Sequence, residues 1–326
     1  MFIAISNKKI VVTGGAGFIG SNLCEVLLEK GNSVVCLDNF STGNRDNISS
    51  FIDNPNFTLI EGDIRNLAAC LQATEGADYV LHQAALGSIP RSIKDPITTT
   101  EVNINGFLNI LIAVRDHKVK RLVYAASSST YGDSRILPKE EDIIGNPLSP
   151  YGITKYVNEL YAAVFAKTYG IETIGLRYFN VFGKRQDPAG PYAAVIPKFI
   201  SQLMNLQPPT INGDGSYSRD FTYIANIVQI NLLSLVADKN AVNKVYNAAF
   251  GACNTLSNLT ILLKQELSKF DKRIAEVPIK YGAERLGDVA HSYASISKAK
   301  DLLNYKPNYS LQKGLQESVK WYWENL

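Results

Sequence analysis

Short apolar runs alternate with helical patterns along the first 180 residues of the chain. The first run, Ile10–Thr13, is almost continuously apolar, which is typical of a strand covered on both faces. Leu23, Val26 and Leu27 then follow at helical spacing. This alternation predicts parallel βαβ units in a doubly wound sheet. The predicted strands are Ile10–Thr13, Val34–Leu37, Phe57–Ile60, Tyr79–His82, Leu122–Ala126 and Thr173–Arg177.

Helical patterns lie between these strands and dominate the second half of the chain. The predicted helices are Asn66–Gln72, Asn105–Asp116, Tyr151–Tyr169, Ala193–Asn205, Ala225–Ala237, Leu256–Phe270 and Leu311–Asn325. Segments rich in Pro and Gly, Gly183–Pro191 and Gln207–Gly215, are interpreted as loops. The prediction is an α/β protein with a Rossmann-type nucleotide-binding domain over residues 1–180. Residues 181–326 form mainly a smaller α/β substrate-binding domain, and the chain is free to cross between the two.

Composition narrows the class of protein without pointing to a function. The 326 residues are 46% hydrophobic and 19% charged, and 33 Lys and Arg nearly balance 30 Asp and Glu. The basic residues are scattered and the net charge of the chain is only +3, so the sequence predicts no basic surface for nucleic acid. No apolar run approaches the ~18 residues of a membrane helix, and no secretory leader pattern is evident. Four cysteines without a Cys-x-x-Cys pair and three dispersed histidines predict neither a disulfide framework nor a metal site. We expect a soluble, cytoplasmic protein.

A glycine-rich turn follows the first predicted strand and opens the first helix. Its spacing is Gly14-x-x-Gly17-x-x-Gly20. Glycines here permit a tight turn, a close approach to a pyrophosphate and close packing of helix on strand, while the helix N-terminus offers free N–H donors. Asp38, at the end of the second strand, is placed to accept both ribose hydroxyls of NAD and to repel the 2′-phosphate of NADP. Asp63-Ile64, after the third strand, is a weaker candidate for the adenine edge.

Tyr151 and Lys155 stand one helical turn apart at the start of a predicted helix. An ammonium group beside the phenol favours phenolate, which would lower the pKa of the tyrosine and let it act as a general base. The strand Leu122–Ala126 ends in the hydroxyl run Ser127-Ser128-Ser129-Thr130. Because ligands bind at the carboxyl ends of parallel strands, we expect these hydroxyls near the reacting atoms.

Together these motifs resemble those of the extended short-chain dehydrogenases/reductases, and among them the nucleotide-sugar 4-epimerases. The resemblance covers the whole chain and is closest to bacterial UDP-N-acetylglucosamine/UDP-N-acetylgalactosamine 4-epimerases. The segments that carry it are Thr13–Gly20, Asp38–Gly43, Glu61–Arg65, His82–Ala85, Ala85–Ser92, Leu176–Gly183, Tyr192–Lys198 and Ser218–Phe221.

The resemblance implies bound NAD, a UDP-sugar substrate and a catalytic set of Tyr151, Lys155 and either Ser127 or Ser128. Tyr151 would take the proton of the sugar 4-hydroxyl, and a serine would bridge to the 4-oxygen. The run of serines leaves the register between Ser127 and Ser128 open. The implied NAD contacts are Gly14, Gly17, Phe18, Ile19, Asp38, Asn39, Ser41, Gly43, Asp63, Ile64, Gln83, Ala84, Ala85, Thr99, Tyr151, Lys155 and Tyr178. The implied UDP-sugar contacts are Ser88, Ser127, Ser128, Asn180, Ala194, Val195, Lys198, Arg219, Arg285 and Ser292.

Two details refine the implied reaction. Related dehydratases carry an Asp-Glu pair where this chain has Ser128-Ser129-Thr130, which disfavours elimination. Galactose-specific relatives place a bulky aromatic side chain at the position of Ser292, and a serine leaves volume for an N-acetyl group. For Arg219 the alternative role is a local ion pair with Asp220, and for Arg285 a place on the surface.

Other functions remain open at this stage: a UDP-glucose, UDP-galactose or UDP-glucuronate 4-epimerase, a decarboxylase or dehydratase, or a nucleotide sensor without turnover. The resemblance also implies a homodimer formed through the helices Asn105–Asp116 and Tyr151–Tyr169. The apolar stripe Phe107, Ile110, Leu111 and Val114 fits such a contact, but it would serve equally to pack the helix on its own sheet.

Overall fold

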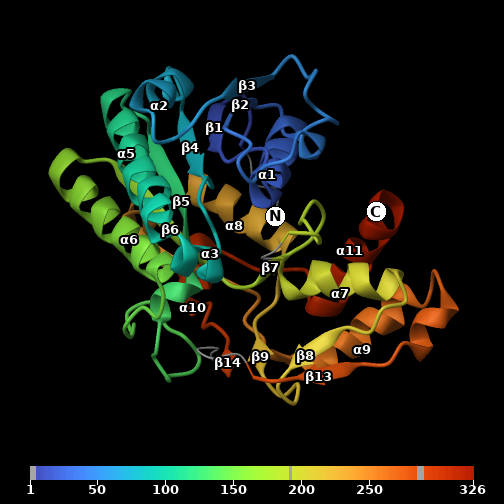
Figure 1. Cartoon of the computed structure of the whole chain (residues 1–326). Helices are drawn as coiled ribbons and strands as arrows, with labels where there is room; N and C mark the ends of the chain where they lie inside the picture. The colour runs from blue at the N-terminus through green and yellow to red at the C-terminus, as the bar shows by residue number, and fades with distance from the viewer. Residues whose placement is uncertain (1–4, 191–192, 285–289) are drawn as a thin grey trace.

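A seven-stranded parallel sheet organises the larger part of the molecule (Figure 1). The structure is a computed structural model that describes residues 5–190, 193–284 and 290–326. The strand order is β11-β6-β5-β4-β1-β2-β3, so the direction of winding reverses between β1 and β4. At such a switch point the carboxyl ends of the strands leave a crevice for a ligand. The strands are β1 (Lys9–Thr13), β2 (Ser33–Asp38), β3 (Phe57–Glu61), β4 (Tyr79–His82), β5 (Arg121–Ser127), β6 (Glu172–Tyr178) and β11 (Lys244–Ala248).

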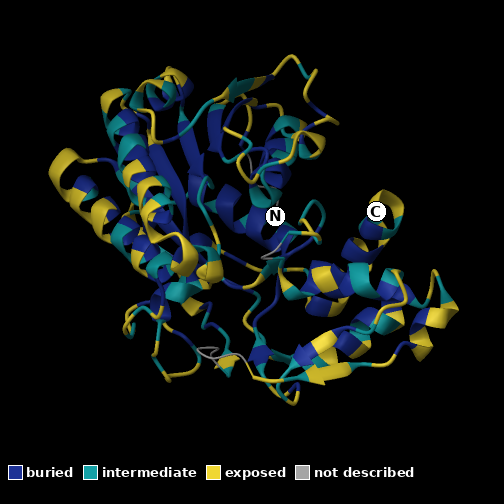
Figure 2. Ribbon diagram, viewed as in Figure 1, coloured by how far each residue is buried: buried dark blue, intermediate teal, exposed yellow. Residues whose placement is uncertain are grey.

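Helices cover both faces of this sheet, as the continuous apolar strands require. One face carries α2 (Leu67–Thr74), α5 (Gly106–Asp116) and α6 (Pro150–Tyr169), and the other carries α1 (Phe18–Glu29) and α8 (Ile224–Leu235). Successive residues of β1 serve the two cores, because Val11 packs in the cluster of α5 while Ile10 and Val12 pack with α1. Figure 2 shows the strands in the middle of the sheet as buried: β4 and β5 are buried at every position, whereas the edge strand β3 is buried only at Phe57. The predicted doubly wound α/β fold is therefore confirmed.

The second half of the chain builds a smaller part below the sheet and also returns to the sheet itself. The smaller part contains α7 (Val195–Met204), α9 (Leu256–Leu267), α10 (Ser297–Leu303), α11 (Leu311–Asn325), β7 (Val181–Phe182), β8 (Thr210–Asn212), β9 (Ser218–Arg219), β10 (Thr222–Tyr223), β12 (Asn254–Thr255), β13 (Lys280–Gly282) and β14 (His291–Ser292). Between these elements α8 packs on the sheet and β11 pairs with β6. The division of the chain at residue 180 stays a prediction.

Several short elements escaped the sequence analysis, among them β11, α3 (Ile89–Lys94), α4 (Pro96–Thr100), α10 and the short strands of the smaller part. The strand β11 is short and stands among loops, and its partner β6 is far away in sequence. The helices α3 and α4 are too short to show a periodic pattern. The segment 207–215 was expected to be a loop, but β8 lies within it and pairs with β13.

A continuous helical stretch, Pro96–Asp116, joins α4 to α5 through a π-helical turn at Glu101–Asn105. By length and composition it is apolar enough to cross a membrane, so the expectation that no stretch reaches this length was wrong. Its most apolar window is 44% buried, and Phe107 and Leu111 are fully buried against the sheet. In this fold the stretch therefore packs as a core helix of the sheet layer.

Candidate active site

The glycine turn leads from β1 into the N-terminus of α1 at the switch point of the sheet. Gly14 has a φ of +68°, and a Cβ there would lie 2.7 Å from the Ala84 backbone nitrogen. A Cβ on Gly20 would lie 2.1 Å from the Gly14 carbonyl oxygen. Gly17 is the N-cap residue of α1 and donates its N–H to the Gly14 carbonyl at 3.1 Å. Glycine is thus required at both ends of the turn, which brings a helix N-terminus to the crevice.

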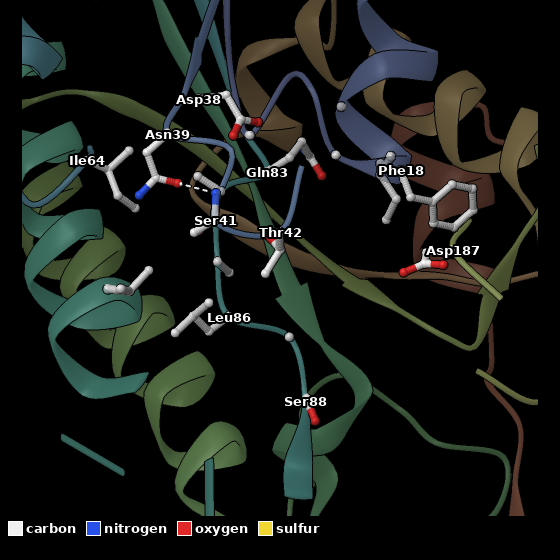
Figure 3. Close-up of a pocket in the computed structure, with 18 of the residues that line it drawn as sticks. Phe18, Asp38, Asn39, Ser41, Thr42, Ile64, Gln83, Leu86, Ser88 and Asp187 are labelled. Atoms are coloured by element: carbon white, nitrogen blue, oxygen red, sulfur yellow. Dashed lines mark hydrogen bonds between the residues drawn. The ribbon is translucent and has the colours of Figure 1, made fainter. Parts of the chain in front are cut away.

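A cavity of about 420 Å³ opens beside this turn (Figure 3). It runs from the N-terminus of α1 past the end of β2 to the start of α3. The sequence-predicted residues that line it are Gly14, Gly17, Phe18, Ile19, Asp38, Asn39, Ser41, Asp63, Ile64, Gln83, Ala84, Ala85, Ser88 and Ala194. The lining residues that were not predicted are Gly20, Leu37, Thr42, Gly62, Leu86, Gly87, Arg91, Val102, Gln186, Asp187, Gly190 and Ala193.

Asp38 ends β2 with its carboxylate at the cavity wall. One oxygen accepts the Ala16 N–H at 2.9 Å and the other accepts the Phe40 N–H at 2.8 Å. Burial raises the pKa of Asp38, and these backbone donors partly offset the effect. Each carboxylate oxygen has a further lone pair, so the group can still accept two hydroxyl donors from a ribose.

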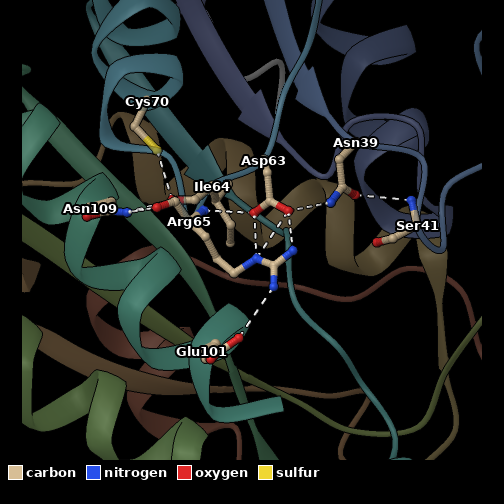
Figure 4. Close-up of polar contacts among 8 residues, drawn as sticks. All are labelled: Asn39, Ser41, Asp63, Ile64, Arg65, Cys70, Glu101 and Asn109. Carbon is tan, nitrogen blue, oxygen red and sulfur yellow. Dashed lines mark hydrogen bonds and ion pairs between the residues drawn. The ribbon is translucent and has the colours of Figure 1, made fainter. Parts of the chain in front are cut away.

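Asp63 organises the part of the cavity wall next to Asp38 (Figure 4). It accepts the Asn39 amide at 2.9 Å and the Arg65 guanidinium at 2.8 Å, and Arg65 also pairs with Glu101. The hydrogen bonds from Arg65 hold the pKa of Asp63 below its ordinary value. The Asn39 side chain in turn accepts the Ser41 N–H at 3.1 Å. Asp63 therefore fixes the Asn39 and Ser41 loop that forms the cavity rim.

The remaining predicted residues lie outside the cavity lining or outside the described chain. Gly43 leaves room for the Asp38 carboxylate, because a Cβ at this position would lie 3.0 Å from one of its oxygens. Thr99 is buried and donates its hydroxyl to the Asp95 carbonyl at 2.8 Å, which is a contact within α4. Arg285 falls outside the described residues. The other predicted residues that do not line the cavity are Ser127, Ser128, Tyr151, Lys155, Tyr178, Asn180, Val195, Lys198, Arg219 and Ser292.

The predicted catalytic side chains come together where β5 ends and α6 begins. Ser127 is the last residue of β5, and its hydroxyl interacts with the phenol of Tyr151, the second residue of α6. The Lys155 ammonium donates to the Ala125 carbonyl of the same strand at 2.7 Å. Its Nζ lies 6.0 Å from the centre of the Tyr151 ring. The structure thus brings the tyrosine, the lysine and one of the two candidate serines into one cluster.

The electrostatics of this cluster differ from the sequence expectation. Burial raises the pKa of Tyr151, and the hydrogen bond with Ser127 opposes that rise. Burial also lowers the pKa of Lys155 to about 8. The Tyr151 pKa is thus raised and not lowered as expected, because burial is the largest influence on it, and the Lys155 ammonium donates to the Ala125 carbonyl. The Ser127 hydroxyl is what favours phenolate.

A hydrogen-bonded group on the strand next to Ser127 reaches the cavity. Tyr178, at the end of β6, is the register partner of Ser127 and donates its hydroxyl to the Gln83 side chain at 3.0 Å. Gln83 itself lines the cavity. The buried Asn231 of α8 completes the group by donating to the Tyr178 hydroxyl at 2.9 Å. Sequence analysis missed Asn231, since nothing along the chain marks a single asparagine on an apolar helix as a neighbour of the site.

Two predicted substrate residues are neighbours across a small sheet. Ser292 of β14 is the register partner of Arg219 of β9. The Arg219 guanidinium donates to the Ser218 and Ala290 carbonyls at 2.9 and 3.0 Å. The buried Asp220 accepts backbone N–H groups of Phe250 and Gly251, so its carboxylate supports a loop. Of the other predicted substrate positions, Lys198 and Asn180 are exposed, and Asn180 has a φ of +32°.

The segment 184–187 brings further groups to the cavity from the second half of the chain. Gln186 and Asp187 both line the cavity, and Asp187 lies next to Phe18 in Figure 3. The side-chain oxygen of Gln186 is buried without a hydrogen-bond partner in the described structure. No motif marks this segment, because its place depends on contacts with α1 and α11. Among the residues that the structure describes, no group of three or more His, Cys, Asp or Glu could hold a metal ion.

Comparison with known proteins agrees with this geometry. Residues 10–249 match the NAD dependent epimerase/dehydratase family. The chain belongs to this family. A putative UDP-glucose 4-epimerase of Methanocaldococcus jannaschii is 37% identical over 96% of the chain and 97% of its own length.

Two solved structures of family members share the complete fold. The UDP-N-acetylglucosamine 4-epimerase of Methanobrevibacter ruminantium, in complex with UDP-N-acetylmuramic acid, has a TM-score of 0.92 and 38% identity over 99% of this chain and all of its own. The UDP-glucuronic acid 4-epimerase of Bacillus cereus, in complex with UDP-glucuronic acid and NAD, has a TM-score of 0.87 and 32% identity over 97% of this chain and 99% of its own.

NAD is the cofactor of this family member, and its own residues fit that cofactor. The α1 N-terminus and the absence of a Cβ at Gly14 suit a pyrophosphate. The Asp38 carboxylate suits a free ribose and disfavours a 2′-phosphate.

Proposed function

We propose that this epimerase-family protein interconverts UDP-GlcNAc and UDP-GalNAc by inversion at C4 of the sugar. The coarser function, NAD-dependent 4-epimerisation of a UDP-sugar, agrees with the family and with the relatives described above. The observation that carries the proposal is the cluster of Ser127, Tyr151 and Lys155 at the point where β5 ends and α6 begins.

In this proposal Tyr151 takes the proton of the sugar 4-hydroxyl and later returns it. Ser127 hydrogen-bonds the phenol and thereby stabilises its deprotonated form. Lys155 is held near the end of β5 by the Ala125 carbonyl, and it would hold the nicotinamide ribose of a bound NAD. NAD, when bound, accepts a hydride from C4 and gives it back to the other face of the 4-keto sugar. Arg219 supplies a guanidinium for the diphosphate.

The N-acetylated sugars are the finer part of the proposal and rest on Ser292. This side chain is small, half-buried and beside Arg219 on neighbouring strands. A site that holds the diphosphate at Arg219 would leave volume at Ser292 for a substituent on C2 of the sugar. The solved relative with 38% identity is a UDP-N-acetylglucosamine 4-epimerase, which supports the same substrate class.

The test is product chromatography after incubation of the NAD-loaded protein with UDP-GlcNAc, UDP-Glc and UDP-GlcA separately. We expect UDP-GalNAc from the first without added reductant, and equal or lower conversion of UDP-Glc. Tyr151→Phe should abolish every conversion, since it removes the proton acceptor and keeps the ring. Faster conversion of UDP-GlcA would reassign the substrate, and no conversion despite bound NAD would reject the epimerase function.

Replacement of Ser292 separates the substrate assignment from the reaction. Ser292→Tyr fills the volume beside the sugar, so the acetylated pair should slow at least about tenfold more than UDP-Glc/UDP-Gal. Ser292→Ala is the matched control and should keep the wild-type ratio. Equal slowing of both pairs by Ser292→Tyr would show that this residue does not adjoin the C2 substituent.

A homodimer formed through α6 is a further part of the proposal. The apolar stripe of α5 is not available for it, because Phe107, Ile110, Leu111 and Val114 are fully buried on the chain's own sheet. Exposed apolar side chains instead lie on α6 and on the adjoining α3 and α4, and Figure 2 shows exposed positions of α6 in yellow. They are Ile93, Ile97, Ile153, Leu160 and Val164.

Light scattering at micromolar concentration tests the dimer. The wild type should show twice the chain mass of 35.9 kDa. Val164→Glu, which puts a charge on a side chain that is 57% exposed, should shift the mass towards the monomer. Ile261→Glu on α9, at a residue 50% exposed, is the matched control and should stay dimeric. A monomeric wild type would reject the dimer.

A further inference from the structure

A buried ion pair stands behind the catalytic cluster and takes no part in the proposed chemistry. Glu159 lies on α6, about two helical turns beyond Tyr151, and Arg177 lies on β6 beside Tyr178. The two groups form a bidentate pair with distances of 2.9 Å and 2.7 Å. Their side chains are only 7% and 4% exposed.

This pair contacts the turn that follows Ser127. The 3-10 turn Ser128–Tyr131 begins directly after that serine. Thr130 donates its hydroxyl to Glu159 at 3.5 Å, and the Arg177 guanidinium lies 4.7 Å from the centre of the Tyr131 ring. The Tyr131 hydroxyl donates to the Asn247 side chain at 2.6 Å. One charged pair therefore reaches both the helix of Tyr151 and the turn of Ser127.

The other contacts of the cluster fasten it to the rest of the molecule. Arg177 donates to the Glu141 carbonyl at 2.9 Å. The Glu141 carboxylate accepts the backbone N–H of Asn247, in β11, at 2.8 Å. Each polar group thus has a partner on another element. Displacement of one partner would leave a buried charge unpaired, which makes the arrangement stiff.

We propose that Glu159 and Arg177 are positioning residues that set the distance between the Ser127 hydroxyl and the Tyr151 phenol. Glu159 shares α6 with Tyr151, and through Thr130 and Tyr131 the pair holds the turn that carries Ser127. A reacting group displaced by about 1 Å can lose on the order of 10²-fold in rate. This inference rests on the proposed function, in which Tyr151 and Ser127 act together.

A second ion pair, between the strands β5 and β6, is a matched control. Arg121 of β5 and Glu172 of β6 are register partners and pair at 2.7 Å, with Arg121 buried. They stand at the opposite ends of these strands from Ser127 and Tyr178. Removal of either pair should cost stability, but only the Glu159–Arg177 pair borders the catalytic turn.

The experiment compares two double variants that remove both charges of a pair, so that no unpaired charge stays buried. They are Glu159→Gln with Arg177→Met, and Glu172→Gln with Arg121→Met. We expect the first to lower kcat about 10- to 100-fold. KM should stay within about threefold and bound NAD should be unchanged. The control should keep its kcat within about threefold at a similar loss of Tm. Wild-type kcat in the first variant, or an equal loss in the control, would overturn the proposal.

Two further measurements secure the test. If the first double variant does not fold, Tyr131→Phe replaces it, because it removes only the hydroxyl bonded to Asn247. A lowered kcat then supports the proposal and a wild-type kcat overturns it. Crystal structures of the variants read the Ser127–Tyr151 distance directly, and an unchanged distance also overturns it. The activity of the wild type in the same assay tests the proposed function separately from this inference.

Discussion

Neighbouring groups determine which hydrogen bonds the Ser127 hydroxyl accepts and which it donates. Ser129 donates to the Ser127 oxygen twice, from its backbone N–H at 3.1 Å and from its hydroxyl at 2.9 Å. A serine oxygen has two lone pairs and one proton. With both lone pairs occupied, the proton of Ser127 is directed to the Tyr151 phenol. The hydroxyl therefore donates to the phenolate, which is the direction that lowers the pKa of a tyrosine.

This assignment predicts different effects for the two neighbouring serines. Ser127→Ala removes the donor that lowers the pKa of Tyr151, so the acid limb of the kcat profile should move to higher pH. The rate at pH 7 should fall by about 10²-fold, as for loss of general-base assistance. Ser128→Ala is the matched control and should keep the position of the acid limb. A larger loss in Ser128→Ala would exchange the roles of the two residues.

Sequence alone could place the hydroxyls but could not choose among them. The pattern of β5 predicts where the strand ends, and the run of serines begins at that point. Which serine faces Tyr151 depends on how the turn Ser128–Tyr131 folds back. That turn is held by Asn247 and Arg177, which are distant along the chain. The choice of Ser127 is therefore a tertiary property.

At the scale of elements, the segment 184–187 connects the cofactor cavity with α1 and α11. Glu25 on α1 pairs with Lys184 and Arg185. Although burial alone would raise it, the pKa of Glu25 is lowered by these two partners. Tyr322 of α11 donates its hydroxyl to the Gln186 carbonyl. Since Gln186 and Asp187 line the cavity, these contacts hold one wall of the cofactor site.

We therefore predict that Glu25→Gln speeds the release of NAD. Loss of a half-buried ion pair worth about 1 kcal/mol should raise the release rate about threefold to tenfold. Added salt should speed release from the wild type and have less effect on the variant. The measurement is the rate of exchange of bound NAD for labelled NAD. The control is Glu29→Gln, an exposed glutamate one turn further along α1. Equal rates in wild type and Glu25→Gln would show that the segment does not retain the cofactor.

The elements that sequence predicted and those it missed differ in where their stability originates. The strands β1 to β6 are marked in the sequence by runs of apolar residues. The turn at Gly14 is marked by glycine, which its backbone conformation requires. Both are signals that can be detected locally in the sequence. The segment 184–187 and β11 have no such pattern. Their places follow from contacts with α1, α11 and β6, which are formed only when the sheet is complete.

At the scale of the whole molecule, two buried groups link stability to pH with opposite signs. His82, at the end of β4, shares a hydrogen bond of 2.7 Å with the Thr13 hydroxyl of β1. Burial and the charge of Lys155 lower the pKa of His82 to about 3. Burial raises the pKa of Asp220 to about 6, against the opposing effect of backbone N–H donors. Between about pH 4 and 6 the unfolded chain binds one more proton at His82 and one fewer at Asp220.

These opposite contributions can be separated by replacing the histidine. For His82 the folded pKa is below the unfolded value of about 6.5, so its contribution is fully present above that pH and is lost on acidification. His82→Gln keeps a polar partner for Thr13 and removes the proton uptake. Relative to wild type, its free energy of unfolding should rise by about 1.4 kcal/mol per pH unit from pH 6 to pH 4. At pH 7 to 8 the difference should be constant.

Urea unfolding at each pH measures this difference in the free energy of unfolding. The control is His291→Gln, at an exposed histidine on β14. Parallel stability curves for wild type and His82→Gln would mean that His82 is protonated in the folded protein, against the burial on which the prediction rests.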